Sequence, residues 1–174
     1  TLFRSIDIFV ANVTAGDTAE RSNPWDAAVT TDILATVSCI DAALPMLKQS
    51  QAGAIVYISS MAGIIGTPQI PAYGAAKAGM THYMKTLAMS LVKDGVRVNT
   101  VSPGDIITEG NVWDRIRTTM PDVFKSVLKR NPRGHLGTPE EIAQVVSFMA
   151  SPMASLVNGA HLVVDGCSTT HVHF

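Results

Sequence analysis

The sequence predicts an α/β fold: a doubly wound parallel sheet covered by helices on both faces. Short apolar segments alternate with longer segments of helical periodicity, which are long enough to cross over between parallel strands. The 174 residues are 47% hydrophobic and 16% charged, which suffices for one domain with a substantial core. Ligands of such sheets bind beyond the carboxyl ends of the strands, so functional residues are expected just after strands.

The first elements follow from local composition. Residues 6–11 form an apolar run, typical of a strand buried on both faces. Residues 12–24 are rich in Gly, Asn, Asp, Ser and Thr and are expected to form a loop. Apolar residues then recur at helical spacing over residues 25–48, where Pro45 should kink or shorten the helix.

The centre of the chain repeats this alternation. Residues 54–59 (AIVYIS) predict a second buried strand, and residues 72–93 predict a long helix that has Pro71 at its first turn. A third strand is expected at residues 96–101. The polar segment that follows predicts one helix around residues 113–129.

The last helix has a clear start signal. Thr138 is a capping residue, Pro139 suits the first helical position, and Glu140 and Glu141 complement the helix dipole. The helix is expected to run to about residue 150, and residues 160–164 predict a fourth strand.

Charge and cysteine usage limit the classes of partner. The net charge of −1 favours neither a nucleic-acid nor an anionic-membrane partner. No apolar run approaches the roughly 18 residues expected of a membrane span. Cys39 and Cys167 lack metal-ligand spacing, so no metal site is expected, and two free thiols indicate a reducing cytoplasm.

Three residues form a candidate proton-transfer site. Tyr73 and Lys77 are four residues apart on a predicted helix, so their side chains emerge on one face. Because a phenol has an ordinary pKa near 10, we expect the Lys77 ammonium to lower the pKa of Tyr73. Ser60 ends the preceding strand, where its hydroxyl could bond the same substrate oxygen. A Tyr-x-x-x-Lys pair alone is frequent by chance, whereas the ordered set is far more specific.

Several motifs in this order resemble the classical short-chain dehydrogenase/reductase family. Ser60 lies in ISSMAG, thirteen residues before Tyr73, and YGAAK ends at Lys77. The segments RVNTVSPG (residues 97–104), GTPEEI (137–142) and VVDG (163–166) extend the similarity over essentially the whole chain. The resemblance implies a Rossmann-like fold and makes residues 1–174 a single partial domain.

The resemblance also implies a function. The family exchanges hydride between NAD or NADP and a small-molecule carbonyl or secondary alcohol, commonly as a homodimer or homotetramer. Ser60, Tyr73 and Lys77 would be catalytic, with Asp32 at the position of a family asparagine. The residues that would contact the cofactor are Asn12, Tyr73, Lys77, Pro103, Gly104, Ile106 and Thr108. The alternative is a non-catalytic member that keeps the fold for oligomerisation or binding.

The sequence also departs from the family pattern at its start. It shows no glycine-rich phosphate loop, and residues 6–11 correspond to the family's fourth strand, so we interpret the chain as amino-terminally truncated and lacking the first three strands. Since that loop and its helix hold the pyrophosphate, we expect the 174-residue chain alone to bind NAD(H) weakly or not at all. The strand at residues 6–11 would then have one unpaired edge.

Two further departures concern single residues. Asp32 replaces an asparagine that usually stabilises a helix kink and a proton relay. We expect Asp32 to pair with Lys77 and favour its protonated form, which would support a lowered Tyr73 pKa; the alternative is a solvated or capping aspartate. Asn12 matches one asparagine of the family's Asn-Asn-Ala-Gly turn, whose Ala-Gly is displaced here to Ala15-Gly16.

Overall fold

The strands form one parallel sheet. A computed structural model describes residues 5–16 and 23–172. Within them the strand order along the sheet is the same as the order in the sequence, and every neighbouring pair is parallel. The strands are β1 (Ile8–Ala11), β2 (Ala54–Ile58), β3 (Arg97–Pro103) and β4 (His161–Val164).

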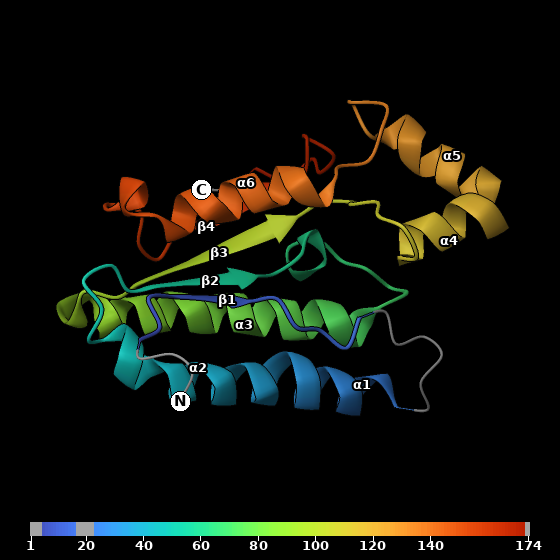
Figure 1. Ribbon diagram of the computed structural model, residues 1–174. Helices are drawn as coiled ribbons and strands as arrows, with labels where there is room; N and C mark the ends of the chain where they lie inside the picture. Colours follow the sequence, from blue (N-terminus) through green and yellow to red (C-terminus); the bar gives the residue numbers. More distant parts are fainter. Residues whose placement is uncertain (1–4, 17–22, 173–174) are drawn as a thin grey trace.

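Helices cover both faces of this sheet, as the sequence predicts (Figure 1). One face of the sheet is covered by α3 and by the continuous helix α1–η1–α2, which is drawn below α3 in Figure 1. The other face is covered by α6. The principal helices are α1 (Pro24–Ala27), the π-helical η1 (Ala28–Ala35), α2 (Thr36–Leu47), α3 (Pro71–Leu91), α4 (Val112–Thr119), α5 (Pro121–Arg130) and α6 (Pro139–Ala150). The short 3₁₀ turns are η2 (Met61–Gly63), η3 (Val92–Asp94) and η4 (Pro152–Ala154).

Alternation along β2 divides the core into two layers. Ile55 and Tyr57 face α2 and α3, whereas Val56 packs with Val101 and Met149 beneath α6. All of these side chains are at most 2% exposed. A strand whose two faces are both buried reads as a continuous apolar run, which is why AIVYI was recognisable in the sequence.

The first strand differs from its prediction. A strand buried on both faces was expected, but β1 covers only residues 8–11, and Ile8 and Val10 are 48% and 41% exposed. In the described part of the chain β1 pairs with β2 alone, and the helices that cover the sheet leave this face of β1 open. Among the described residues the outer edge of β1 is unpaired, as expected, and so is the outer edge of β4.

The helix predicted at residues 25–48 is confirmed and runs continuously from Pro24 to Leu47. It continues two residues past Pro45 and spans 24 residues, and an 18-residue window within it has a mean hydropathy of 1.5, so by length and composition alone it could cross a membrane. The helix is not the uninterrupted apolar run that the sequence was said to lack, because Asp32 and Asp41 lie within it. Its inward positions, including Asp32, Ile40 and Leu47, pack against α3 and the sheet, as in the core helix of a globular domain.

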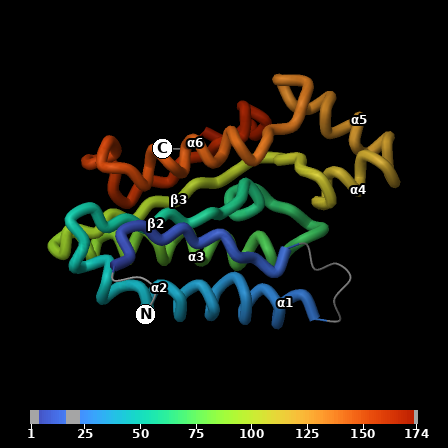
Figure 2. The backbone as a smooth tube through the Cα atoms, viewed as in Figure 1, coloured from blue at the N-terminus to red at the C-terminus, as the bar shows by residue number. Residues whose placement is uncertain are grey.

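The single helix expected at residues 113–129 is instead two helices, α4 and α5. Pro121 opens α5, and Met120 before it takes φ −136° and ψ 62°. The proline ring disfavours helical geometry at the preceding residue, so the chain turns there. Figure 2 shows that α4 and α5 lie beyond the carboxyl ends of β2 and β3.

Candidate active site

The site lies where the sheet meets the first half of α3. Ser60 lies two residues after the end of β2, and Tyr73 and Lys77 project from the first two turns of α3. Gly63 and Gly74 allow the close approach that this needs: a Cβ on Gly63 would lie 2.9 Å from Ala78 N, and one on Gly74 would lie 2.7 Å from Ala62 O. The turn η2 and helix α3 are thereby held in backbone contact.

The Lys77 ammonium is the centre of the cluster. The residue is 3% exposed, and its Nζ donates to the carbonyl oxygen of Ile58 at 3.0 Å. It also lies 3.6 Å from Oδ1 of Asp32. The ring centroids of Tyr57 and Tyr73 lie 5.1 Å and 5.5 Å from Nζ, within cation–π range.

Asp32 is a structural member of this cluster. It is 1% exposed, so the alternative of a solvated aspartate is wrong. Its Oδ1 accepts a hydrogen bond from the Thr14 hydroxyl, and its Oδ2 accepts one from the backbone N–H of Ala15 at 3.1 Å. Together with the ion pair to Lys77, these bonds tie the turn after β1 to η1 and α3.

Ser60 has two local roles. Its backbone is extended, and its Oγ accepts from the N–H of Ala62 at 3.1 Å, which caps the η2 turn. Its side chain also hydrogen bonds to Tyr73, which lowers the pKa of that phenol. The two hydroxyl groups therefore meet at the rim, as the motif spacing predicts.

The net pKa of Tyr73 moves opposite to the expected direction. Burial raises it above the ordinary value, the Ser60 hydrogen bond lowers it, and the negative charge of Asp32 raises it again. The expectation of a lowered pKa is wrong for this arrangement, because desolvation by burial is the largest effect and the charge of Asp32 adds to it. Asp32 does favour protonated Lys77, as expected, although burial lowers the pKa of Lys77 overall.

The other predicted cofactor residues lie along the same edge. Asn12 is exposed in the turn after β1, and Pro103 ends β3. Gly104 packs against Asp165, since a Cβ on it would lie 2.7 Å from the Cβ of that residue. Ile106 forms a β-bridge with Gly137.

The segment after this bridge is held by Asn111, whose Nδ2 donates to the carbonyl oxygen of Ile106 at 2.7 Å. Thr108 is exposed in this segment. The structure thus brings Ser60, Tyr73, Lys77 and Asp32 together and spreads the remaining predicted residues along the rim.

Sequence reasoning missed Tyr57 and Thr14. Tyr57 lies in the middle of β2, inside a run recognised only as buried strand, and its position two residues after Ile55 could have placed it on the α3 face. Thr14 lies in a polar turn whose composition gives no sign of a partner 18 residues later.

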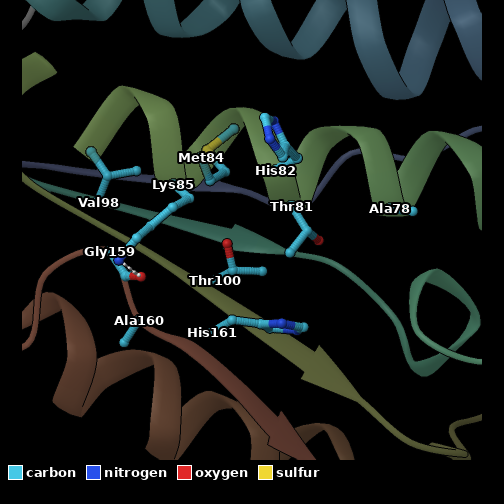
Figure 3. Close-up of a pocket in the computed structure, with 10 residues that line it drawn as sticks. All are labelled: Ala78, Thr81, His82, Met84, Lys85, Val98, Thr100, Gly159, Ala160 and His161. Atoms are coloured by element: carbon cyan, nitrogen blue, oxygen red, sulfur yellow. Dashed lines mark hydrogen bonds between the residues drawn. The ribbon is translucent and has the colours of Figure 1, made fainter. Parts of the chain in front are cut away.

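A cavity of about 300 Å³ lies elsewhere, between α3 and the last two strands (Figure 3). Val98 and Gly159 line it near the amino ends of β3 and β4, and Thr81 faces it from α3. The Lys85 ammonium donates to the carbonyl oxygen of Gly159 at 3.1 Å beside it. This cavity is thus distinct from the Ser60–Tyr73–Lys77 cluster at the opposite ends of the strands.

A family model described as enoyl-(acyl carrier protein) reductase matches residues 1–169. The chain belongs to the short-chain dehydrogenase/reductase family. Among curated members, an isoepoxydon dehydrogenase of Aspergillus clavatus is 35% identical over 162 residues, covering 92% of this chain and 62% of that protein. A 3-oxoacyl-(acyl-carrier-protein) reductase of Thermotoga maritima is 34% identical over 168 residues, covering 92% and 65%.

Solved structures of the family superimpose closely. An oxidoreductase of Burkholderia thailandensis gives a TM-score of 0.82 at 32% identity, covering 97% of this chain and 66% of that one. An NADPH-bound short-chain oxidoreductase of Pseudomonas aeruginosa, described as containing an atypical catalytic centre, gives 0.81 at 26% identity, covering 95% and 66%. The chain spans about three-fifths of the length of the first curated relatives that it matches.

Proposed function

We propose that the protein is an NAD(P)-dependent oxidoreductase that interconverts a carbonyl and a secondary alcohol by hydride transfer, with Tyr73 as the acid or base on the substrate oxygen. The observation that best supports the proposal is the convergence of Ser60, Tyr73 and Lys77 at the carboxyl edge of the sheet. Family membership and the NADPH-bound relative from P. aeruginosa agree with it.

The residues at this edge fit the nicotinamide–ribose end of a dinucleotide. The Lys77 ammonium is fixed by Ile58 and Asp32 and can donate to ribose hydroxyls, and the Tyr73 phenol lies beside it. Bound NAD or NADP would accept or supply the hydride. The backbone from Pro103 to Thr108 would line the nicotinamide side, and Asn12 the adenosine ribose.

Ser60 and Tyr73 would then have separate roles in the transfer of the proton. Ser60 donates a hydrogen bond that positions and polarises the substrate oxygen, and Tyr73 gives a proton to that oxygen or takes one from it. Because its pKa is raised, Tyr73 is a neutral phenol at neutral pH. That state suits carbonyl reduction, whereas alcohol oxidation needs the phenolate and hence a higher pH.

The test is a comparison of variants in the natural full-length polypeptide, assayed with carbonyl and secondary-alcohol panels and both cofactors. We expect Tyr73→Phe to lower kcat/KM by about 100-fold or more, since it removes the group that transfers the proton. Tyr83→Phe, on the same helix but outside the cluster, is the matched control. Equal activity in wild type and Tyr73→Phe would contradict the proposal, and absence of turnover in both would favour the non-catalytic alternative.

A further inference from the structure

The Lys77 ammonium lies over the rings of two tyrosines, of which the family resemblance assigns a role only to Tyr73. We propose that Tyr57 is a positioning residue of the proton-transfer site, whose aromatic ring holds the Lys77 ammonium beside Tyr73 and Asp32. The inference deepens the proposed function and rests on it for its catalytic consequence. It concerns the ring of Tyr57, not the hydroxyl.

The geometry supports a ring contact. Nζ of Lys77 lies 5.1 Å from the centroid of Tyr57, closer than the 5.5 Å to Tyr73. Tyr57 is 1% exposed and Lys77 is 3% exposed, so little water competes for the ammonium. A cation over a desolvated aromatic face is held more strongly than one at an exposed site.

The hydroxyl group of Tyr57 does not explain why a tyrosine occupies this position. It is buried and has no hydrogen-bond partner among the residues that the structure describes. Burial, together with the charge of Asp32, raises the pKa of Tyr57 far above the ordinary value, so the phenol does not ionise near neutral pH. An unpaired, non-ionising hydroxyl is a poor member of a proton relay, which leaves the ring as the functional part.

The Tyr57 ring adds an aromatic contact to the two polar contacts that hold the Lys77 ammonium. The carbonyl oxygen of Ile58 and the carboxylate of Asp32 bind it by hydrogen bond and charge. Tyr57 precedes Ile58 on β2, so the ring and the carbonyl group that contact the ammonium belong to the same strand. Lys77 is thereby held beside the ring of Tyr73.

A fluorination series separates the ring's charge attraction from its shape. Site-specific incorporation replaces Tyr57 by Phe, 3,5-difluoro-Phe and 3,4,5-trifluoro-Phe, which progressively weakens cation–π attraction at nearly constant volume. The titration midpoint of Lys77 is measured by ¹³C NMR of labelled lysine in the natural full-length polypeptide, with the Lys77 signal assigned from Lys77→Met. The same series at Tyr83 is the control, and thermal unfolding of every variant reports stability.

We expect Tyr57→Phe to leave the Lys77 midpoint unchanged and the fluorinated rings to lower it stepwise, by about half a pH unit at trifluoro-Phe. The pH dependence of kcat should shift in parallel, whereas the series at Tyr83 should shift neither quantity. A midpoint constant across the Tyr57 series would overturn the proposal. So would a full shift on Tyr57→Phe alone, which would assign the effect to the hydroxyl. The NMR midpoint needs no turnover, so failure of the proposed function is distinguishable.

Discussion

At the scale of single residues, Asp32 acts on two neighbours in ways that oppose each other for catalysis. Its charge favours the protonated form of Lys77, and a positively charged Lys77 would stabilise the Tyr73 phenolate. The same charge disfavours the Tyr73 phenolate directly. An asparagine would exert neither effect, so this site is electrostatically distinct from one that carries the usual family residue.

Replacing Asp32 by Asn should therefore move the working pH. Removing the negative charge should lower the pKa of Tyr73, because Asp32 raises it. The rising limb of the pH profile for alcohol oxidation should shift to lower pH, measured as kcat/KM in the natural full-length polypeptide. Asp41→Asn, exposed on the same helix, is the matched control. An unchanged profile would show that Asp32 serves structure alone.

The raised pKa of Tyr57 leads to a second prediction, which concerns the stability of the fold at alkaline pH. The Tyr57 pKa is raised in the fold, so the folded protein keeps this proton above pH 10 while the unfolded chain releases it. Stability is fully present below pH 10 and is lost as pH rises beyond it, by about 1.4 kcal/mol per pH unit for one such group. Tyr57→Phe should flatten the fall in unfolding free energy above pH 10, measured by urea titration. Parallel curves for both proteins above pH 10 would contradict this.

At the scale of elements, the side chain of Arg97 caps the carboxyl end of α6. Arg97, at the start of β3, donates to the carbonyl oxygens of Met149, Ala150 and Ser151 at 2.7–3.0 Å. The last turn of α6 carries no basic residue of its own. The unpaired carbonyls at the helix end thus find a cation supplied by the sheet.

Arg97→Met should consequently lower the free energy of unfolding by about 2–3 kcal/mol, since it leaves partly buried carbonyls without their charged donor. Urea unfolding measures the change. Arg117→Met is the control, because Arg117 pairs with Asp114 at an exposed position where an ion pair contributes little. Equal losses in both variants would refute a special role for Arg97.

At the scale of the whole molecule, the open edge of β1 is the feature with the largest expected consequence. Ile8 and Val10 expose apolar surface on a strand that pairs on one side only within the described residues. Unpaired apolar edges template association with other strands. Residues 1–174 expressed by themselves should therefore self-associate through β1.

A charged residue on this strand should suppress the association. Val10→Lys should lower the weight-average mass seen in sedimentation velocity, because edge lysines oppose strand pairing. Val29→Lys is matched to it, since Val29 is 42% exposed and Val10 is 41% exposed, but Val29 lies on η1. If both variants sediment like the wild type, association occurs elsewhere or not at all.

The sequence predicted the alternating architecture well because β2 is buried on both faces and has a continuous apolar sequence, and because segments of helical periodicity separate the strands. It predicted that Ser60 would lie near Tyr73 and Lys77 because the motif spacing places Ser60 just after β2 and the other two residues on α3. It could not predict the Tyr73 pKa, which depends on desolvation and on Asp32. Nor could it reveal Thr14, since contacts across 18 residues leave no local pattern.

The bonds of Asp32 have a consequence for engineering. A carboxylate accepts through two oxygens, and here one faces Thr14 and Lys77 while the other faces the N–H of Ala15. An amide has one accepting oxygen and would turn an NH₂ group toward one of these donors. Asparagine at position 32 should thus be tolerated best when the 12–16 turn is exchanged with it. Residue 32 and the 12–16 turn should therefore be exchanged as a pair when the site is grafted into another member of the family.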